Sequence, residues 1–194
     1  MIAIPHHDEQ LAAEAANAVR RVAFKELPDG DQALIRAALE ITRASYSPYS
    51  GFAVGAAVKG RSGRVHVGTN FENASYGITM CAEVAAITAA NTAGEHVVDT
   101  IAVIGHKYTP PESIDQPVTP CGRCRQMIAE IAQSGGTNVR VLSCSGDLST
   151  ILETTIGELL PEAFGPASMG MVDTWVRTRP KLAAAVEKLK RQAR

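Results

Sequence analysis

The sequence predicts an α/β layered fold, because short apolar runs typical of strands alternate with longer helical segments. The apolar runs cover residues 52–59, 65–69, 100–105 and 138–143, and apolar residues at helical spacing mark residues 31–45, 81–93 and 121–133. A chain of 194 residues that is 45% hydrophobic and 20% charged has ordinary globular composition and enough length to bury a core.

The first part of the chain contains two predicted helices before the first strand. An Ala-rich stretch over residues 9–26 has apolar side chains at helical spacing and predicts a helix that ends before Pro28. A second helix is expected from Asp31, as its N-cap, to about Ser45. The two apolar runs that follow are separated only by a short polar turn, so they predict a β-hairpin.

The second part of the chain alternates helices, loops and strands. Residues 81–93 predict a buried Ala-rich helix, and residues 121–133 predict a helix that stops at a Ser-Gly-Gly sequence. Between them, residues 107–119 hold three prolines without periodicity and predict a loop. A final basic helix is expected over residues 172–194. Its apolar positions predict that it packs along the body of the protein: Trp175, Val176, Leu182, Val186 and Leu189.

Charge and hydropathy exclude several classes of function. The chain has 19 Lys+Arg against 20 Asp+Glu, whereas proteins that coat nucleic acid polymers usually carry a basic surface. No apolar run approaches the roughly 20 residues that a membrane-spanning helix needs, and residues 1–9 lack the apolar stretch of a signal peptide. We therefore expect a soluble, cytoplasmic protein whose partners include neither a nucleic acid polymer nor a membrane.

The four cysteines are the first indication of chemistry: Cys81, Cys121, Cys124 and Cys144. A chain of this length without an export signal is not expected to depend on disulfides, so its CxxC pair indicates metal binding or redox chemistry. A thioredoxin-like redox pair is one alternative, although that motif normally follows the first strand of a βαβ unit. A closed structural zinc site held by all four cysteines is the other.

Two cysteine motifs each open a predicted helix: Cys81-Ala82-Glu83 and Pro120-Cys121-Gly122-Arg123-Cys124. Two helix N-termini can converge on one point, and their partial positive charge favours the thiolate form of cysteine. Three thiolates would leave the fourth position of a tetrahedral zinc open, as in catalytic zinc sites. Glu83 points in a different direction from Cys81 on a helix, so we predict that it carries protons beside a zinc-bound water and does not bind the metal.

Further motifs follow one another along residues 31–166. They are Ser47-Pro48-Tyr49-Ser50 with Phe52 and Val54-Gly55-Ala56-Ala57, Asn70-Phe71-Glu72-Asn73-Ala74-Ser75-Tyr76-Gly77, the two cysteine motifs with Arg125-Gln126, and Leu159-Leu160-Pro161-Glu162-Ala163-Phe164-Gly165-Pro166. Together they resemble the small homotetrameric zinc-dependent cytidine deaminases. The resemblance implies a three-layer α/β/α fold with a central mixed sheet of about five strands over residues 31–166. Residues 1–30 and 167–194 would then be helical extensions.

The same resemblance implies the roles of the site residues. The zinc ligands would be Cys81, Cys121 and Cys124, with one Zn²⁺ per subunit, and Glu83 would be the proton shuttle. The contacts with a small-molecule nucleoside would come from Phe52 on the base, the backbone N–H of Ala82 and the carbonyl of Thr119 on the pyrimidine edges, and Asn70 and Glu72 on the ribose 3′-hydroxyl. Asn70 and Glu72 share a face if their segment is extended.

The residues that match the family's intersubunit contacts are Ala74, Tyr76 and Phe164. In the family these positions reach into the site of a neighbouring subunit. The resemblance therefore implies a homotetramer with shared active sites. It also implies hydrolytic deamination of cytidine and 2′-deoxycytidine to uridine and 2′-deoxyuridine with release of ammonia, as in pyrimidine salvage.

One position departs from the family pattern. Many members with three cysteine ligands have Arg directly after Cys-Ala-Glu, whereas this chain has Val84. Blasticidin S deaminase also lacks that Arg and has a similar Pro-Cys-Gly-Arg-Cys-Arg-Gln segment. We predict that Arg123 supplies the positive charge near the thiolates. Two alternatives stay open: a deaminase of a modified cytosine nucleoside or of an aminonucleoside antibiotic such as blasticidin S, and a zinc-stabilised protein that binds a nucleoside without converting it.

Overall fold

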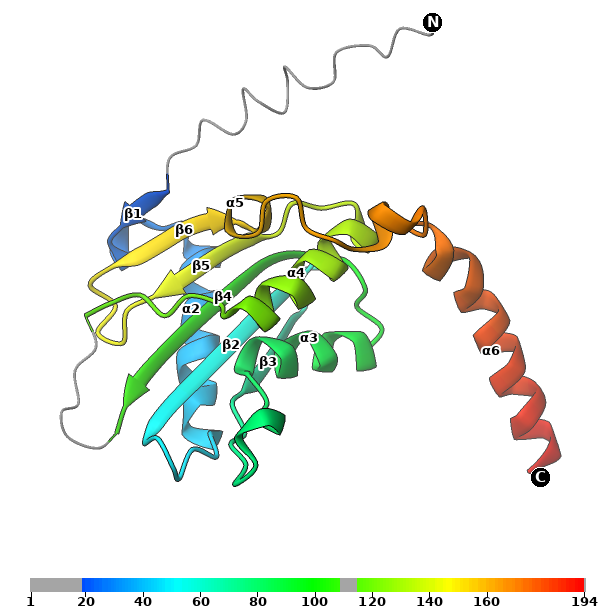
Figure 1. Cartoon of the computed structure of the whole chain (residues 1–194), viewed down its shortest axis with the longest axis horizontal. Helices are drawn as coiled ribbons and strands as arrows, with labels where there is room; N and C mark the ends of the chain where they lie inside the picture. The colour runs from blue at the N-terminus through cyan, green and yellow to red at the C-terminus, as the bar shows by residue number, and fades with distance from the viewer. Residues whose placement is uncertain (1–18, 109–114, 194) are drawn as a thin grey trace, which may run out of the picture.

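The computed structural model describes residues 19–108 and 115–193, which fold around a six-stranded mixed sheet (Figure 1). The strands are β1 (Arg20–Val22), β2 (Phe52–Gly60), β3 (Val65–Thr69), β4 (Val98–Lys107), β5 (Arg140–Cys144) and β6 (Ile151–Thr155). They lie side by side in the order β1-β6-β5-β4-β2-β3. The pair β4 and β5 is parallel and the other neighbouring pairs are antiparallel.

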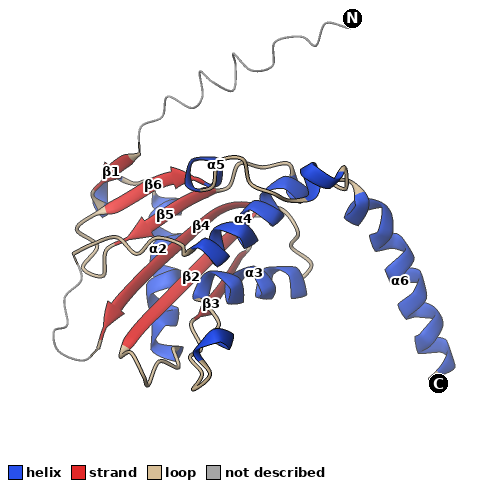
Figure 2. Ribbon diagram, viewed as in Figure 1, coloured by secondary structure: helices blue, strands red, loops and turns tan. Residues whose placement is uncertain are grey.

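Helices cover both faces of the sheet, which confirms the three-layer α/β/α arrangement (Figure 2). The helix α2 (Asp29–Ile41) lies on one face, and α3 (Ala82–Thr92) and α4 (Gly122–Gly135) lie on the other. The short α5 (Ile156–Leu159) adjoins α4. The sheet has one strand more than the expected five.

The buried strand β4 shows why the layers form. Its residue Ile101 packs in the core beneath α3 and α4, whereas Ala102 and Ile104 pack in the core beneath α2. Successive side chains of a strand point to opposite faces, so a strand that is covered on both sides needs a continuous apolar run. Residues 101–104 of β4 are such a run, and they place the strand at the centre of the molecule.

Most predicted elements are confirmed to within a few residues at each end. The hairpin is β2 and β3, paired antiparallel. The three helices expected over residues 31–45, 81–93 and 121–133 correspond to α2, α3 and α4. Gly136, which directly follows α4, has the left-handed conformation that glycine favours. Residues 109–114 of the predicted loop lie outside the described residues.

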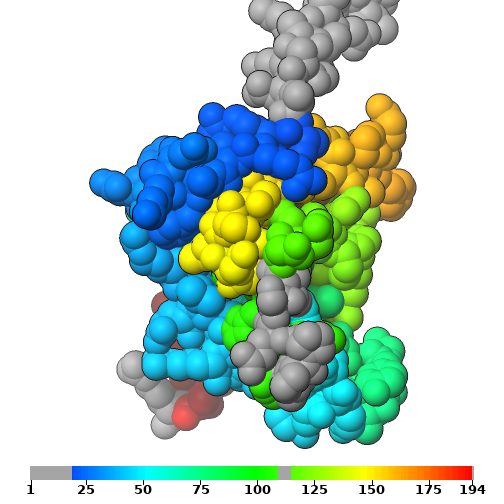
Figure 3. All heavy atoms as spheres, turned by 90° about the vertical axis from the view of Figure 1, so that its left-hand side faces the viewer, coloured from blue at the N-terminus to red at the C-terminus, as the bar shows by residue number. Residues whose placement is uncertain are grey.

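The prediction of a helix over residues 9–26 is wrong for its last part, and residues 9–18 lie outside the described residues. Arg20–Val22 is the edge strand β1, paired antiparallel with β6. The Arg20 guanidinium lies 2.8 Å from Glu153, which is 133 positions further along the chain. Because its partner is so distant, the strand leaves no local periodic signal, and tertiary pairing overrode the helical spacing of these residues. Figure 3 shows the dark blue segment that contains β1 beside the yellow turn between β5 and β6.

The predicted N-cap of α2 is also wrong. The helix begins at Asp29, after Pro28, so Asp31 lies inside its first turn. The Asp31 carboxylate is buried and accepts a 2.9 Å bond from the Arg140 guanidinium, which also binds Glu153 at 2.6 Å. Asp31 therefore joins α2 to two strands through a guanidinium with two carboxylate partners, and this role was not visible in the sequence.

The final helix is confirmed as α6 (Thr174–Gln192), but it does not pack along the body. It runs away from the sheet, and none of its residues is buried (Figure 1). Its contact with the body is at its start, where the Trp175 ring meets the His96 ring edge-on at 5.7 Å. Among the described residues, no helix is both long and apolar enough to cross a membrane.

We predict that Gly68→Ala destabilises the fold, because Gly68 is where the hairpin touches α3. A Cβ at this position would overlap the backbone of Ala82, Ala85 and Ala86 in that helix. Overpacking of this kind costs about 1–3 kcal/mol, which a lower denaturation midpoint would show. The control is Gly30→Ala in α2, where a Cβ meets nothing within 4 Å. That variant should keep or slightly raise stability, and equal midpoints for the two variants would contradict the prediction.

Candidate zinc site

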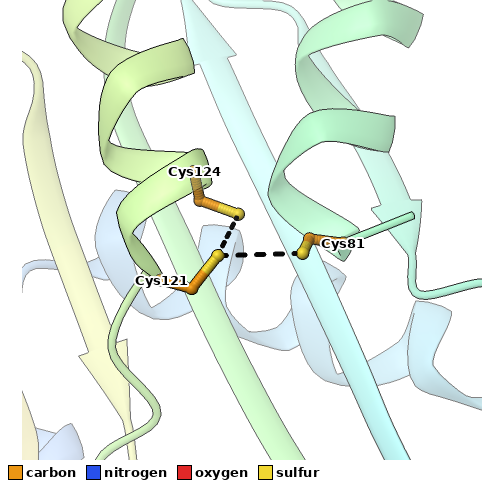
Figure 4. A group of neighbouring side chains, drawn as sticks. All are labelled: Cys81, Cys121 and Cys124. Atoms are coloured by element: carbon orange, nitrogen blue, oxygen red, sulfur yellow. Dashed lines mark hydrogen bonds between the residues drawn. The ribbon is translucent and has the colours of Figure 1, made fainter. Parts of the chain in front are cut away.

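Three cysteines meet where two helices begin (Figure 4). The sulfur of Cys121 lies 3.9 Å from that of Cys81 and 3.4 Å from that of Cys124, and all three sulfurs lie within 4.8 Å of one another. Sulfurs bound to one tetrahedral Zn²⁺ at about 2.3 Å would be roughly 3.8 Å apart. The donor set and its spacing therefore fit a single zinc ion with three thiolate ligands.

The fold brings these cysteines together through the two helices on one face of the sheet. Cys81 directly precedes α3 and Cys121 directly precedes α4, both with extended backbone, and Cys124 lies in the first turn of α4. Helix N-termini carry unsatisfied N–H groups and partial positive charge, which stabilise thiolates placed there. The prediction that the two cysteine motifs converge is confirmed.

The fourth cysteine is not part of this cluster. Cys144 is buried at the end of β5, and it packs in the core beneath α2, on the other face of the sheet. Burial raises the pKa of the Cys144 thiol to about 12, which disfavours the thiolate that a metal requires. A closed zinc site with four cysteine ligands is therefore excluded.

The thiols of the cluster influence one another strongly. A hydrogen bond with the Cys124 thiol lowers the pKa of Cys81 to about 6, burial opposes this shift, and the Cys121 thiol and the positive charge of Arg123 add to it. The same contact with Cys81, together with burial and the charge of Glu83, raises the pKa of Cys124. The cluster thus favours the thiolate form of Cys81 and disfavours that of Cys124. A cation bound between the sulfurs would stabilise both thiolates.

Glu83 lies in the first turn of α3 and is 4% exposed. Burial raises the pKa of its carboxyl group, and the negative charge of Cys81 raises it further. A carboxyl group with a raised pKa can both accept and donate a proton near neutral pH, which general acid–base chemistry requires. The structure thus places a buried carboxyl group with a raised pKa beside the Cys124 thiol.

The predicted base-binding residues lie on neighbouring segments. Phe52 begins β2, and its ring packs on Gly105 of β4, where a Cβ would lie 2.6 Å from the ring. The same Gly105 is close to the side chain of Val118, which directly precedes Thr119. A hydrogen bond of 3.0 Å from the Val118 N–H to the Cys144 carbonyl holds that segment to the sheet. Phe52 and Thr119 are therefore held on adjoining segments.

The predicted ribose-binding pair is buried, with Asn70 joined to β2 and Glu72 joined to the residues that precede β2. The Asn70 side chain accepts a 2.9 Å bond from the Val54 N–H and donates a 3.0 Å bond to the Phe52 carbonyl. The Glu72 carboxylate accepts bonds from the N–H groups of Tyr49 and Ser50. Burial opposes ionisation of Glu72, but these bonds and one from the Ser50 hydroxyl outweigh it and lower the Glu72 pKa. Glu72 is therefore negatively charged at neutral pH.

The residues expected at intersubunit contacts are exposed in the isolated chain: Ala74, Tyr76 and Phe164. The Tyr76 ring meets the Tyr49 ring edge-on at 5.8 Å. The Phe164 carbonyl accepts a 2.8 Å bond from the Gln126 side chain, which fixes Phe164 near the start of α4. Neither aromatic ring is covered by the described part of its own chain.

Two arginines support the cluster, and only one of them was predicted. Arg123 donates a 3.1 Å bond to the Thr79 carbonyl, two residues before Cys81. Arg125 binds the carbonyls of Pro120 and Leu159 at 2.9 and 3.1 Å, and so holds the residue that precedes Cys121. Sequence reasoning gave Arg125 no role. Its only signal was its place within the cysteine motif.

Comparison with known proteins places this cluster in a family. The family model described as "Cytidine and deoxycytidylate deaminase zinc-binding region" matches residues 28–136, which include all three cysteines and Glu83. The chain belongs to the cytidine and deoxycytidylate deaminase family. The family's zinc-binding region coincides with the three-cysteine cluster, so the chain has a zinc centre with one ion per chain.

Individual members of the cytidine and deoxycytidylate deaminase family support this assignment. The chain is 41% identical over 138 residues to the cytidine deaminase of Halalkalibacterium halodurans, an alignment that covers 71% of this chain and 96% of that protein. It is 38% identical over 141 residues to the cytidine deaminase of Mycobacterium tuberculosis, with 72% of this chain and 93% of that protein covered.

Solved structures of cytidine deaminases share the fold. The Burkholderia pseudomallei enzyme matches with a TM-score of 0.59 and 39% identity over 68% of this chain and 97% of its own. The Mycobacterium tuberculosis enzyme matches with a TM-score of 0.54 and 33% identity over 72% of this chain and 99% of its own. These relatives favour neither an antibiotic deaminase nor a protein that binds a nucleoside without converting it.

Proposed function

We propose that this chain catalyses the zinc-dependent hydrolytic deamination of cytidine and 2′-deoxycytidine to uridine and 2′-deoxyuridine, with release of ammonia. The observation that carries the proposal is the buried carboxyl group of Glu83 beside three thiols that fit one Zn²⁺. A site that served only to hold zinc or to bind a nucleoside would not need this carboxyl group. The relatives named cytidine deaminase supply the substrate class.

Glu83 and the zinc centre carry out different parts of the proposed reaction. When bound, Zn²⁺ lowers the pKa of a coordinated water and so supplies hydroxide near neutral pH. Glu83 accepts the proton and delivers it to N3 of the cytosine ring, which makes C4 electrophilic. Hydroxide attacks C4, and Glu83 takes the remaining proton of the new C4–O group and gives it to the 4-amino group. The C4–N bond then breaks, ammonia leaves and the C4 carbonyl of uridine remains. Because burial raises the Glu83 pKa, the same group can serve as base and then as acid.

Binding of the nucleoside is assigned to the residues around the cluster. Phe52 packs on the base, the Ala82 N–H and the Thr119 carbonyl hold the pyrimidine edges, and Asn70 and Glu72 bind the ribose 3′-hydroxyl. The hydrogen bonds that Asn70 and Glu72 already make to the 49–54 segment support this assignment, because they fix both side chains before substrate arrives. A negatively charged Glu72 would repel a 3′-phosphodiester, which favours free nucleosides.

Arg123 is proposed to stabilise the thiolates, and Arg123→Ala should therefore weaken the site. Three thiolates leave Zn²⁺ with a formal charge of −1, and nearby positive charge restores its ability to polarise water. The Arg123 charge already lowers the Cys81 pKa. We expect about a 10–100-fold loss of zinc affinity or of kcat, measured by chelator competition and by turnover. The matched control is Arg61→Ala, which removes an exposed guanidinium bound to Asp99. Equal zinc affinity and turnover in the two variants would refute this role.

The assembly is proposed to be a homotetramer with shared sites. Exposed aromatic side chains support this, because the Tyr76 and Phe164 rings are uncovered in the single chain. Tyr76 contacts Tyr49, whose N–H binds Glu72, and the Phe164 carbonyl is bound by Gln126 of α4. In such an assembly Ala74, Tyr76 and Phe164 would complete the site of a neighbouring subunit. Sedimentation would give a mass of four chains. A cytoplasmic enzyme of pyrimidine salvage is the cellular role that this activity supports.

The test is turnover by the purified, zinc-loaded protein. Cytidine, 2′-deoxycytidine and blasticidin S are incubated separately, and the ultraviolet change and the ammonia released are measured. We expect one ammonia for each cytidine converted to uridine, and loss of this activity with a chelator that zinc reverses. Turnover of the antibiotic alone would overturn the proposed substrate. Recovery of all three compounds unchanged would overturn the proposal that this chain is a deaminase.

A further inference from the structure

Tyr108 directly follows β4 and contacts both ends of a tight turn, residues 47–51, that lies far away in the sequence. The Tyr108 hydroxyl donates a 2.6 Å hydrogen bond to the carbonyl of Ser47, where the turn begins. The Tyr108 backbone N–H donates a 3.2 Å bond to the carbonyl of Gly51, where the turn ends. The turn is closed by a 3.1 Å bond from the Gly51 N–H to the same Ser47 carbonyl. One residue therefore holds the turn at its start and at its end.

The middle of the 47–51 turn binds the carboxylate of Glu72. The N–H groups of Tyr49 and Ser50 donate bonds of 2.9 and 3.3 Å to the same carboxylate oxygen, Oε2. Successive backbone N–H groups converge on one anion only where a turn brings them together. Glu72 is buried, and these bonds help to lower its pKa. The position of the charged Glu72 therefore depends on the shape of the turn that Tyr108 holds.

The same turn is joined to Asn70 through two serine hydroxyls. Ser47 Oγ lies 2.8 Å from Ser45 Oγ, and Ser45 Oγ donates a 2.5 Å bond to Asn70 Oδ1. Because Oδ1 also accepts the Val54 N–H, the orientation of the Asn70 amide is fixed. Ser47 is buried, so its hydroxyl depends on partners within the chain. Both members of the proposed ribose-binding pair are thus connected to the turn.

We propose that Tyr108 is a positioning residue for the sugar of the nucleoside. Its hydroxyl fixes the 47–51 turn, and the turn fixes Glu72 and Asn70 where they bind the 3′-hydroxyl. The identity of the sugar rests on the proposed function, whereas the contacts of Tyr108 with the turn do not. Sequence analysis assigned no role to Tyr108, because 61 positions separate it from Ser47.

Tyr108→Phe tests this role, because it removes the hydroxyl and keeps the ring. The matched control is Tyr46→Phe. Tyr46 and Tyr108 are similarly exposed, at 48% and 51%, but the Tyr46 ring stacks on Phe71 and its hydroxyl bonds to none of the described residues. Both variants should fold and bind zinc like the unsubstituted chain, so a difference between them reports on the Tyr108 hydroxyl.

The ligands for the test are 2′-deoxyuridine and 2′,3′-dideoxyuridine, which differ only in the 3′-hydroxyl. They are not consumed, so calorimetry can measure the Kd of each for the zinc-loaded variants. Tyr108→Phe should weaken binding of 2′-deoxyuridine by about 3–10-fold, as expected for one lost hydrogen bond, and leave that of 2′,3′-dideoxyuridine unchanged. KM for 2′-deoxycytidine should rise by the same factor with kcat unchanged, because the sugar is remote from C4. Equal Kd values in Tyr108→Phe and Tyr46→Phe, or an equal loss for both ligands, would overturn the proposal.

Amide hydrogen exchange tests the hold on the turn without reference to catalysis. The N–H groups of Tyr49, Ser50 and Gly51 should exchange faster in Tyr108→Phe than in Tyr46→Phe, because the turn opens more often. Equal exchange in the two variants would overturn the proposal. If the unsubstituted chain converted no nucleoside, the proposed function would fail, while faster exchange in Tyr108→Phe would still support the hold of Tyr108 on the turn.

Discussion

Glu83→Gln is expected to lower kcat for cytidine by about 10²–10⁴-fold, because an amide cannot pass protons in both directions. The substitution keeps the size of the side chain, which is buried in the first turn of α3. Zinc content should therefore remain at one ion per chain, and cytidine should still bind. Steady-state turnover, metal analysis and equilibrium binding of cytidine measure the three quantities.

The control for this prediction is Glu130→Gln on α4, an exposed carboxylate on the same face of the sheet. It removes the same negative charge without removing the proposed proton carrier, so turnover should stay near that of the unsubstituted protein. Full activity in Glu83→Gln would show that another group moves the protons. Loss of zinc from Glu83→Gln would show that the carboxylate is a ligand.

Cys124→Ala is expected to abolish zinc binding and turnover together. Cys124 is fully buried in the first turn of α4, and two remaining thiols cannot retain Zn²⁺ against a chelator. Because the ion ties the starts of α3 and α4 together, its loss should also lower the melting temperature. A chelator should lower the melting temperature of the unsubstituted protein and leave that of Cys124→Ala unchanged.

Cys144→Ala is the matched control, since Cys144 is equally buried but packs on the other face of the sheet. Its loss of packing should cost about 1 kcal/mol of stability, while zinc content and sensitivity to the chelator are retained. If Cys144→Ala lost zinc and Cys124→Ala kept it, the proposed ligand set would be wrong.

The zinc cluster was predictable because its signals are local. Each cysteine motif begins a helix, and the residues that open a helix and their periodicity can be recognised from a short window of sequence. Once both helices are placed on one face of a sheet, their N-termini can meet, as Cys81 and Cys121 do. The support that Arg125 gives to the Pro120 and Leu159 carbonyls was not predictable, because those partners become neighbours only after folding.

The errors of sequence reasoning have the same cause. The edge strand β1 exists because β6 lies beside it, and Asp31 is buried because Arg140 from β5 reaches it. Neither partner is close in sequence. The amphipathic pattern of α6 correctly predicted a helix with one apolar face, but such a pattern does not state what covers that face.

By itself, the sequence determined the α/β class, the helices α2, α3, α4 and α6, four of the six strands, the three thiols with their adjacent carboxyl group, and the family. These features depend on local spacing and residue type, which a linear chain displays directly. Only the tertiary structure decided that Cys144 stands apart from the cluster, that β1 completes the sheet and that α6 leaves the body. Those features depend on which distant segments share a face, and that is decided by packing of the whole chain.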